Sequence, residues 1–162
     1  MYLFDSNAFM EAARLYYSFS IAPGYWDWLV EKHEAGEIAS ISSVYDEITA
    51  GEGGLVKWAK DPALDGFWLP DSKESILATA ELAAWANHAE RPFKQAAVDE
   101  FMGSADLRLA AQASALGATV VTRETADPNC RKRVKLPDAA KAVGVKCVQP
   151  FVAYEQLGLT LF

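Results

Sequence analysis

Four acidic residues stand at positions where a sheet of parallel strands would place chemistry. Asp5 follows a short apolar run, Glu47 lies one turn into the segment after a second run, and Asp106 opens an apolar helical stretch. Glu124 comes two residues after Thr122, at the end of a β-prone run. Because ligands bind at the carboxyl ends of the strands in open parallel sheets, these acids are the first candidates for a functional site.

Each acid also has an ordinary explanation when it is taken alone. Asp5 can cap a helix, and Asp106 in a first helical turn can interact with the helix dipole. Glu47 and Glu124 can be solvated surface acids. Taken together, carboxylates gathered at one sheet edge would repel one another, and a divalent cation removes that conflict. The joint pattern therefore favours a metal site.

The ligand types select the metal. Carboxylate oxygens without nearby cysteine or histidine favour Mg²⁺ or Mn²⁺ over zinc. His33 and His88 fall on expected helices away from the four strand ends, which argues against a zinc site or a histidine base. The sequence also offers no convincing Ser/His/Asp or Cys/His set for a protein nucleophile.

The elements that would hold the acids alternate between strand and helix. Strands are expected at residues 2–4, 38–41, 118–122 and 145–148. Helices are expected at residues 8–17, 25–35, 44–50, 72–87, 92–102, 105–116, 136–143 and 151–157, and the stretch 55–70 suggests a short helix followed by a strand. This order predicts an α/β fold, a three-layer α/β/α sandwich around a central, mostly parallel sheet.

Length and composition set further limits. A chain of 162 residues with 51% hydrophobic side chains predicts one domain over residues 1–162. No apolar run approaches the ~18 residues of a membrane span, and Cys130 and Cys147 make no disulfide framework. A cytoplasmic location is expected.

The net charge of −7 argues against a nucleic-acid partner, but the charge is unevenly spread. Residues 123–135 hold five basic and two acidic side chains, so this basic segment is where a polyanion would bind. The basic residues expected to bind RNA are Arg123, Arg131, Lys132, Arg133 and Lys135. The alternative is a solvated surface run.

Four sequence blocks together resemble the PIN-domain nucleases. They are Asp5-Ser6-Asn7, then residues 43–48 (SVYDEI), 104–113 (SADLRLAAQA) and 120–124 (VVTRE). The third block, an aspartate that opens an alanine-rich helix leading into an apolar strand and a Thr-x-acid, is the most specific. The resemblance covers essentially the whole chain and implies the PIN-like fold.

The resemblance implies an activity and a set of site residues. In this family the matching acids hold one or two divalent ions that cleave RNA, and many members are VapC-like toxins of toxin–antitoxin pairs. Asp5, Glu47 and Asp106 would form the metal-binding core, with Glu124 as a fourth acid where the family more often has Asp or Asn. The residues expected to support the site by hydrogen bonds are Asn7, Ser104 and Thr122.

The implied reaction is hydrolysis of RNA phosphodiester bonds by a metal-activated water, giving 5′-phosphate and 3′-hydroxyl ends. An antitoxin protein is the partner that a toxin requires. The aromatic residues between Tyr16 and Trp28 and the acidic remainder of the chain are also compatible with a homodimer.

Other readings lead to different classes of protein. A haloacid-dehalogenase-type phosphatase needs an aspartate where this chain has Asn7. A receiver domain needs an acidic pair near the first strand, and dinucleotide binding needs a GxGxxG motif after that strand. The sequence has neither of these features. The remaining alternative is a non-catalytic α/β protein-binding module whose acids only cap helices.

Overall fold

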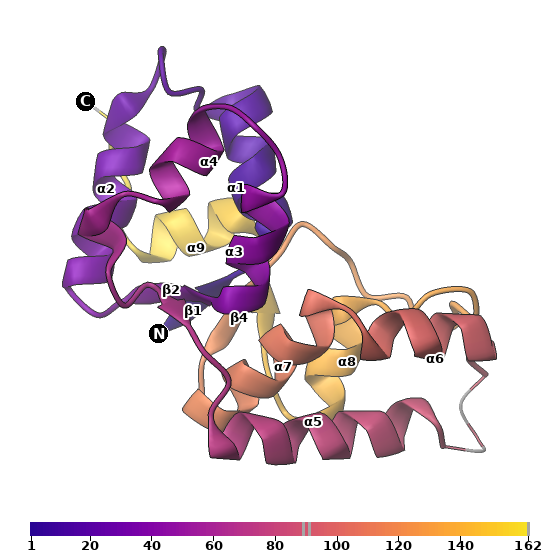
Figure 1. Ribbon diagram of the computed structural model, residues 1–162. Coiled ribbons are helices and arrows are strands. Elements are labelled where there is room, and N and C mark those ends of the chain that lie inside the picture. Colours follow the sequence, from indigo (N-terminus) through magenta and orange to yellow (C-terminus); the bar gives the residue numbers. More distant parts are fainter. Residues whose placement is uncertain (89, 91, 162) are drawn as a thin grey trace. The chain divides into compact units, whose positions relative to one another are not determined.

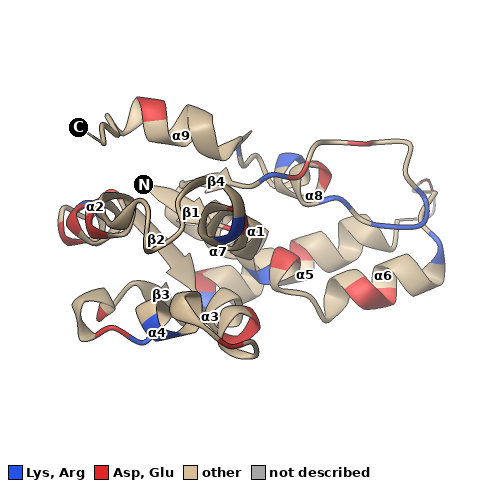
Figure 2. Cartoon of the chain, turned by 90° about the horizontal axis from the view of Figure 1, so that it is seen from above, with Lys and Arg blue, Asp and Glu red and all other residues tan. Residues whose placement is uncertain are grey.

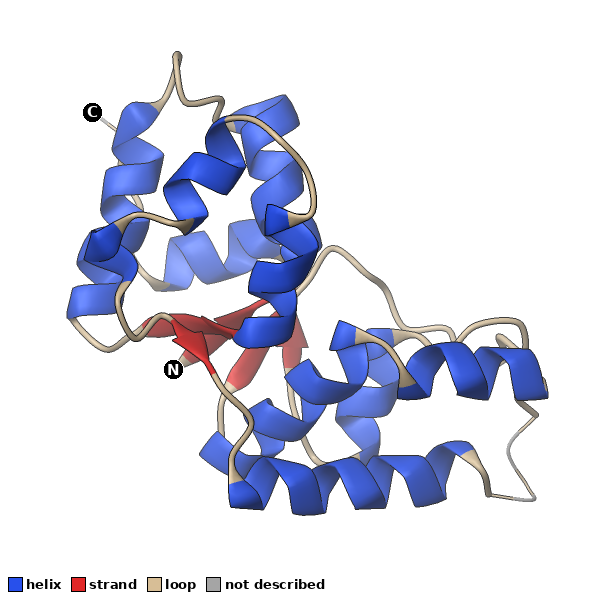
Figure 3. Ribbon diagram, in the orientation of Figure 1, coloured by secondary structure: helices blue, strands red, loops and turns tan. Residues whose placement is uncertain are grey.

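A five-stranded parallel sheet, flanked by helices, forms the centre of the fold in a computed structural model that describes residues 1–88, 90 and 92–161 (Figure 1, Figure 3). The strand order is β3-β2-β1-β4-β5. The strands are β1 (Tyr2–Phe4), β2 (Ile38–Ile41), β3 (Trp68–Leu69), β4 (Thr119–Val121) and β5 (Cys147–Val148). The predicted α/β class is confirmed, and β1, which ends immediately before Asp5, is the central strand.

Strand pairing follows from the apolar runs. Tyr2 pairs with Ile38 in parallel register, and Ser40 pairs with Trp68. All four residues of β2 are buried, as expected for a strand covered on both faces. Because β1 and β2 run parallel, their carboxyl ends point to the same edge of the sheet.

Two compact units make up the chain. The first unit comprises residues 1–70, 121–123 and 148–162, and the second unit comprises residues 71–120 and 124–147. The chain passes between the units within β4 and again within β5. The single domain expected over residues 1–162 stays a prediction.

The first unit is built around aromatic side chains. Its helical elements are α1 (Ser6–Glu11), a π-helical turn (Ala12–Tyr16), α2 (Pro23–Glu34), α3 (Ser42–Thr49), α4 (Gly54–Ala59), a 3₁₀ turn (Pro62–Leu64) and α9 (Pro150–Gln156). Phe4 and Phe9 are fully buried with ring centroids 5.5 Å apart, and Phe9 also contacts Phe67 at 6.1 Å. This packing holds α1 against the end of β1, next to Asp5.

The second unit is built around one buried helix. Its helices are α5 (Lys73–Ala86), α6 (Gln95–Met102), α7 (Ala105–Leu116) and α8 (Leu136–Ala142). Leu109, Ala110 and Ala111 in α7 are fully buried, as expected for a helix that is apolar on nearly every side. Gly117 ends the helix at φ 65°, the left-handed conformation that glycine adopts without steric cost.

Most helices begin or end one or two residues away from their expected bounds, and three differences have a local cause. The expected helix over residues 8–17 ends at Glu11 and continues as the π-helical turn. The helix expected from residue 44 begins already at Ser42, because the chain passes directly from extended Ile41 into α3. The helix expected from residue 92 begins only at Gln95, since Lys94 immediately before it is extended.

None of the helices in the described part of the chain combines the length and apolar character that crossing a membrane requires.

Candidate functional site

The carboxylate of Asp5 is buried at the end of the central strand. Its side chain and backbone together are only 4% exposed. Oδ1 accepts a hydrogen bond of 2.7 Å from the backbone N–H of Ser6, so Asp5 caps α1. Oδ2 accepts a hydrogen bond of 2.8 Å from Thr122 Oγ1. Two donors therefore hold both oxygens in one orientation.

Asn7 joins this network to the segment after β4. Its Nδ2 donates to Thr122 Oγ1 at 3.2 Å, and its Oδ1 accepts from the backbone N–H of Arg123 at 3.1 Å. Because Thr122 receives a hydrogen bond from Asn7 and donates one to Asp5, the orientation of its hydroxyl is defined. The first unit thus brings Asp5, Asn7 and Thr122 together.

Glu47 lies in a different environment of the first unit. It is exposed on α3 and lines a pocket of about 270 Å³ together with Arg14, Phe19 and Glu52. Asp5 is not among the described residues that line this pocket. Within the first unit, Asp5 is buried and Glu47 is exposed.

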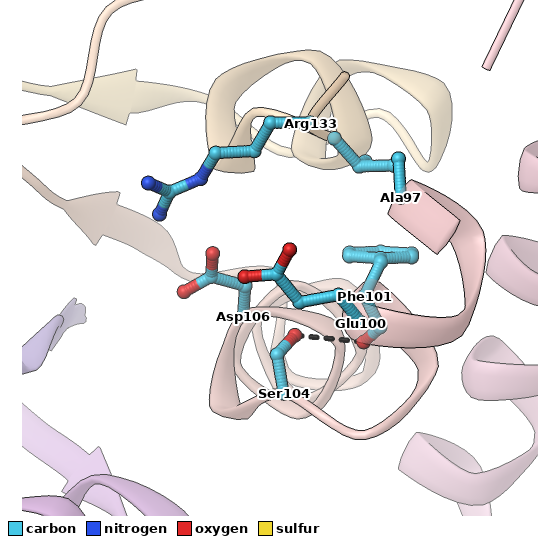
Figure 4. Close-up of a pocket in the computed structure, with 7 residues that line it drawn as sticks. Ala97, Glu100, Phe101, Ser104, Asp106 and Arg133 are labelled. Carbon is cyan, nitrogen blue, oxygen red and sulfur yellow. Dashed lines mark hydrogen bonds between the residues drawn. The ribbon is translucent and has the colours of Figure 1, made fainter. Parts of the chain in front are cut away.

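Asp106 shares a small pocket of the second unit with a second acid, Glu100. Figure 4 shows the two carboxylates on one side of this pocket and the guanidinium of Arg133 on the other. The pocket volume is about 30 Å³, above the roughly 10–15 Å³ that a cavity needs to hold one water molecule. The arrangement can hold one water or one small ion beside two carboxylates.

Ser104 shapes the turn that brings these acids together. Its hydroxyl accepts from the backbone N–H of Leu107 at 3.4 Å, which caps α7, and donates to the carbonyl oxygen of Phe101 at 2.7 Å. A turn through Gly103 and Ser104, closed by backbone hydrogen bonds to the carbonyl oxygens of Glu100 and Phe101, connects α6 to α7. Glu100 was missed from sequence because its approach to Asp106 depends on this turn; an acid one turn before a capped helix is the signal that could have found it.

The Glu124 carboxylate accepts hydrogen bonds from two residues of the second unit. Its Oε1 accepts from Arg133 Nη2 at 2.8 Å, and its Oε2 accepts from the backbone N–H of Leu136 at 2.8 Å. Leu136 is the first residue of α8, so Glu124 satisfies an N–H group that the helix itself leaves open. The glutamate side chain is 14% exposed. These bonds fix the loop between β4 and α8 at its two ends.

The basic segment divides into paired and exposed cations. The guanidinium of Arg123 forms an ion pair of 2.7 Å with Glu11, whereas Arg131 donates from Nε to the carbonyl oxygen of Pro92 at 2.8 Å. Lys132 is exposed and the Arg133 side chain is 54% exposed. Figure 2 shows Lys and Arg along the loop from β4 to α8. This loop offers cations to a polyanion.

The histidines lie elsewhere. His33 Nε2 forms a hydrogen bond of 2.8 Å with the carbonyl oxygen of Asp65, and His88 lies past the end of α5, not on a helix as expected.

The donor chemistry of these residues suits a hard divalent cation. No group of three or more His, Cys, Asp or Glu side chains in residues 1–88, 90 and 92–161 is arranged to hold a metal ion. Mg²⁺ does not require such a cage, because it binds through one or two carboxylates and keeps waters or phosphate oxygens as its other ligands. Asp5 in the first unit and the Glu100–Asp106 pair in the second offer carboxylates of this kind.

The five-stranded parallel sheet flanked by helices is an α/β sandwich with a PIN-like fold. The chain is similar in structure to FitAB bound to the IR36 DNA fragment, with 19% identity, a TM-score of 0.57, and coverage of 93% of this chain and 96% of that chain. It is also similar to FitAcB from Neisseria gonorrhoeae, with 19% identity, a TM-score of 0.56, and coverage of 93% and 99%. These likenesses show the fold.

The family is shown by sequence. The model of the family described as "Domain of unknown function (DUF4411)" matches residues 2–161, and the chain belongs to that family. A search of curated proteins finds no match.

Proposed function

We propose that the protein is an Mg²⁺- or Mn²⁺-dependent endoribonuclease in which Asp5 and Asp106 bind the metal, with Glu47 as a further candidate ligand. The observation that carries the proposal is the buried Asp5 carboxylate, held by Ser6 N–H and Thr122 Oγ1 at the end of the central strand. A carboxylate fixed by neighbouring donors needs little reorganisation to bind a cation. The similarity to the PIN-like fold supports the same assignment.

The chain's own residues take distinct parts in this reaction. Thr122 and Asn7 orient Asp5, and Ser104 orients the first turn of α7, which carries Asp106. Glu124 holds Arg133 and the start of α8, so its contribution to the metal is indirect. Mg²⁺, when bound, supplies an activated water and positive charge for the phosphoryl oxygens. The exposed cations Lys132 and Arg133 bind the RNA backbone.

The proposal includes a place in a toxin–antitoxin pair. Similarity of fold to FitAB, a structure bound to DNA, supports a toxin whose partner is a DNA-binding antitoxin. The exposed apolar side chains of the first unit, among them Leu15 and Ile21, offer surface for such a protein partner or for a second copy of the chain.

Cleavage of end-labelled single-stranded RNA tests the proposal. The wild-type chain is expected to cut in Mg²⁺ or Mn²⁺ and not in EDTA, and to leave 5′-phosphate ends. Asp5→Asn and Asp106→Asn are expected to lose the activity while staying folded. Asp46→Asn is the matched control, because Asp46 is an exposed acid next to Glu47. If the RNA stays intact under all conditions, the proposal of a nuclease is contradicted and a non-catalytic binding module explains the fold better.

A further inference from the structure

A second, larger pocket lies in the second unit and takes no part in the site described above. Its volume is about 340 Å³, at the lower end of the roughly 300–1,000 Å³ of small-molecule sites. The residues that line it include Trp85, Phe93, Ala126, Pro128, Asp138 and Lys141. They come from the end of α5, the segment before α6, the loop after β4, and α8.

Aromatic rings form one wall of this pocket. The ring centroids of Trp85 and Phe93 lie 5.4 Å apart in a T-shaped arrangement, and Trp85 also lies edge-on to Phe101 at 6.4 Å. These contacts hold the indole in place, while Trp85 and Phe93 both remain partly exposed. Fixed aromatic surface that is open to solvent is suited to stacking against a planar ligand.

A carboxylate and an ammonium group stand on α8 beside the rings. Asp138 and Lys141 are three residues apart, so they share one face of the helix. Asp138 Oδ2 accepts a hydrogen bond of 2.9 Å from the backbone N–H of Asp127, which fixes the carboxylate and leaves it further acceptor capacity. The pocket therefore offers an acceptor and a donor next to a stacking surface.

The rim of the pocket is tied to the basic segment. Arg131 Nε donates to the carbonyl oxygen of Pro92 at 2.8 Å, and the backbone N–H of Lys94 donates to the carbonyl oxygen of Arg131 at 2.9 Å. These two bonds join Arg131 to Pro92 and Lys94, the residues immediately before and after Phe93. The exposed cations of residues 131–133 thus begin at the edge of the pocket, where the phosphates of a strand would lie if one of its bases entered it.

We infer that the pocket binds one unpaired base of a single-stranded RNA whose phosphates lie on residues 131–133. This inference rests on the proposed function and names the form of RNA that the enzyme takes. The base lies against Trp85 and Phe93, face-on to one ring and edge-on to the other, and an exocyclic amino group donates to Asp138. Because uracil has no amino group and cytosine has one, the pocket favours cytosine over uracil, two bases of the same size.

Binding of eight-nucleotide oligo(C) and oligo(U) to the full chain tests the inference. Fluorescence anisotropy is measured in EDTA with Asp5→Asn, so that no cleavage interferes. Oligo(C) is expected to bind more tightly than oligo(U), Phe93→Leu to weaken oligo(C) binding about tenfold, and Asp138→Asn to reduce the preference for cytosine. Phe151→Leu and Lys73→Gln, an exposed aromatic and a lysine at the other end of α5, are controls expected to change neither.

Cytidine 5′-monophosphate, tested in parallel, distinguishes a strand from a free nucleotide. It is expected to bind far more weakly than oligo(C), because it has one phosphate for the basic segment; equal affinities would overturn the assignment to a strand. Equal binding of oligo(C) and oligo(U), with Phe93→Leu unchanged, would overturn the base pocket. Metal-dependent cleavage measured separately would then still support the nuclease, whereas a chain that binds the base without cutting RNA would contradict the proposed function alone.

Discussion

Thr122 Oγ1 donates a hydrogen bond of 2.8 Å to Asp5 Oδ2, although 117 positions separate the two residues in the sequence. The pairing arises because β4 lies next to β1, and the Asp5 backbone N–H donates to the carbonyl oxygen of Val121 at 2.9 Å. Two adjacent parallel strands thus end side by side. Asp5, which follows β1, and Thr122, which follows β4, are therefore close enough to form a hydrogen bond. This relationship leads to the first prediction.

Thr122→Val should weaken metal binding by roughly 10- to 100-fold, as is typical when a residue that orients a ligand is replaced. Valine keeps the shape of threonine but removes the hydrogen bond to Asp5. Mn²⁺ affinity by titration calorimetry measures the effect. Thr79→Val is the matched control, since Thr79 donates to the Ser75 carbonyl within α5. Unchanged affinity in Thr122→Val would show that Asp5 needs no such support.

The cations of the basic segment should determine how RNA binding depends on salt. Lys132→Gln removes one exposed cation, and the slope of log affinity against log salt is expected to fall by about 0.7 for a single-stranded RNA. Lys73→Gln, a lysine of α5 outside the segment, should leave the slope as in the wild type. If the Lys132→Gln variant has the same slope as the wild type, the basic segment does not bind RNA through Lys132 and is ordinary solvated surface.

Arg133 differs from Lys132 because it also pairs with Glu124. Arg133→Gln should weaken RNA binding and in addition lower the free energy of unfolding, by about 1 kcal/mol at most for a partly exposed pair. Urea unfolding of Arg133→Gln, Glu124→Gln and the double variant gives the coupling between the two side chains. Fully additive effects would mean that the ion pair contributes nothing to stability.

A buried pair of tyrosines should make the first unit sensitive to alkali. The hydroxyls of Tyr25 and Tyr154 lie 2.6 Å apart, and burial raises the pKa of each above its ordinary value of 10.0. Because folding raises these pKa values, their contribution to stability is complete below about pH 10 and is lost as the pH rises toward the folded-state values. The melting temperature should therefore fall steeply above about pH 10.

The double variant Tyr25→Phe, Tyr154→Phe is expected to reduce that fall. Tyr154→Phe alone leaves the buried Tyr25 hydroxyl without this partner and should cost about 1–3 kcal/mol of stability near neutral pH. If the double variant were as alkali-sensitive as the wild type, other groups would be responsible.

The parts of the site that follow from strand order could be predicted from the sequence. Apolar runs before Asp5 and Thr122 place both residues at strand ends, and a parallel sheet turns those ends to one edge. The left-handed stop at Gly117 and the cap at Ser104 each depend on the conformational preference of a single residue, and such features can be predicted from the sequence.

The parts that depend on side-chain packing could not. Glu11 reaches Arg123 across 112 positions, and no local pattern indicates which of the 22 acids pairs with that arginine. Glu100 and Asp106 line one pocket because of the turn at Gly103 and Ser104 between α6 and α7. The π-helical turn at Ala12–Tyr16 escaped prediction because its spacing of apolar residues differs little from that of an α-helix.

Calorimetric titration of the metal-free chain with Mn²⁺ tests the central claim most directly. The wild type should bind Mn²⁺, and Asp5→Asn and Asp106→Asn should each lose at least tenfold in affinity, while Asp46→Asn should match the wild type. The same affinity in the wild type, Asp5→Asn and Asp106→Asn, or no binding by any of them, would contradict a metal site built on these two carboxylates.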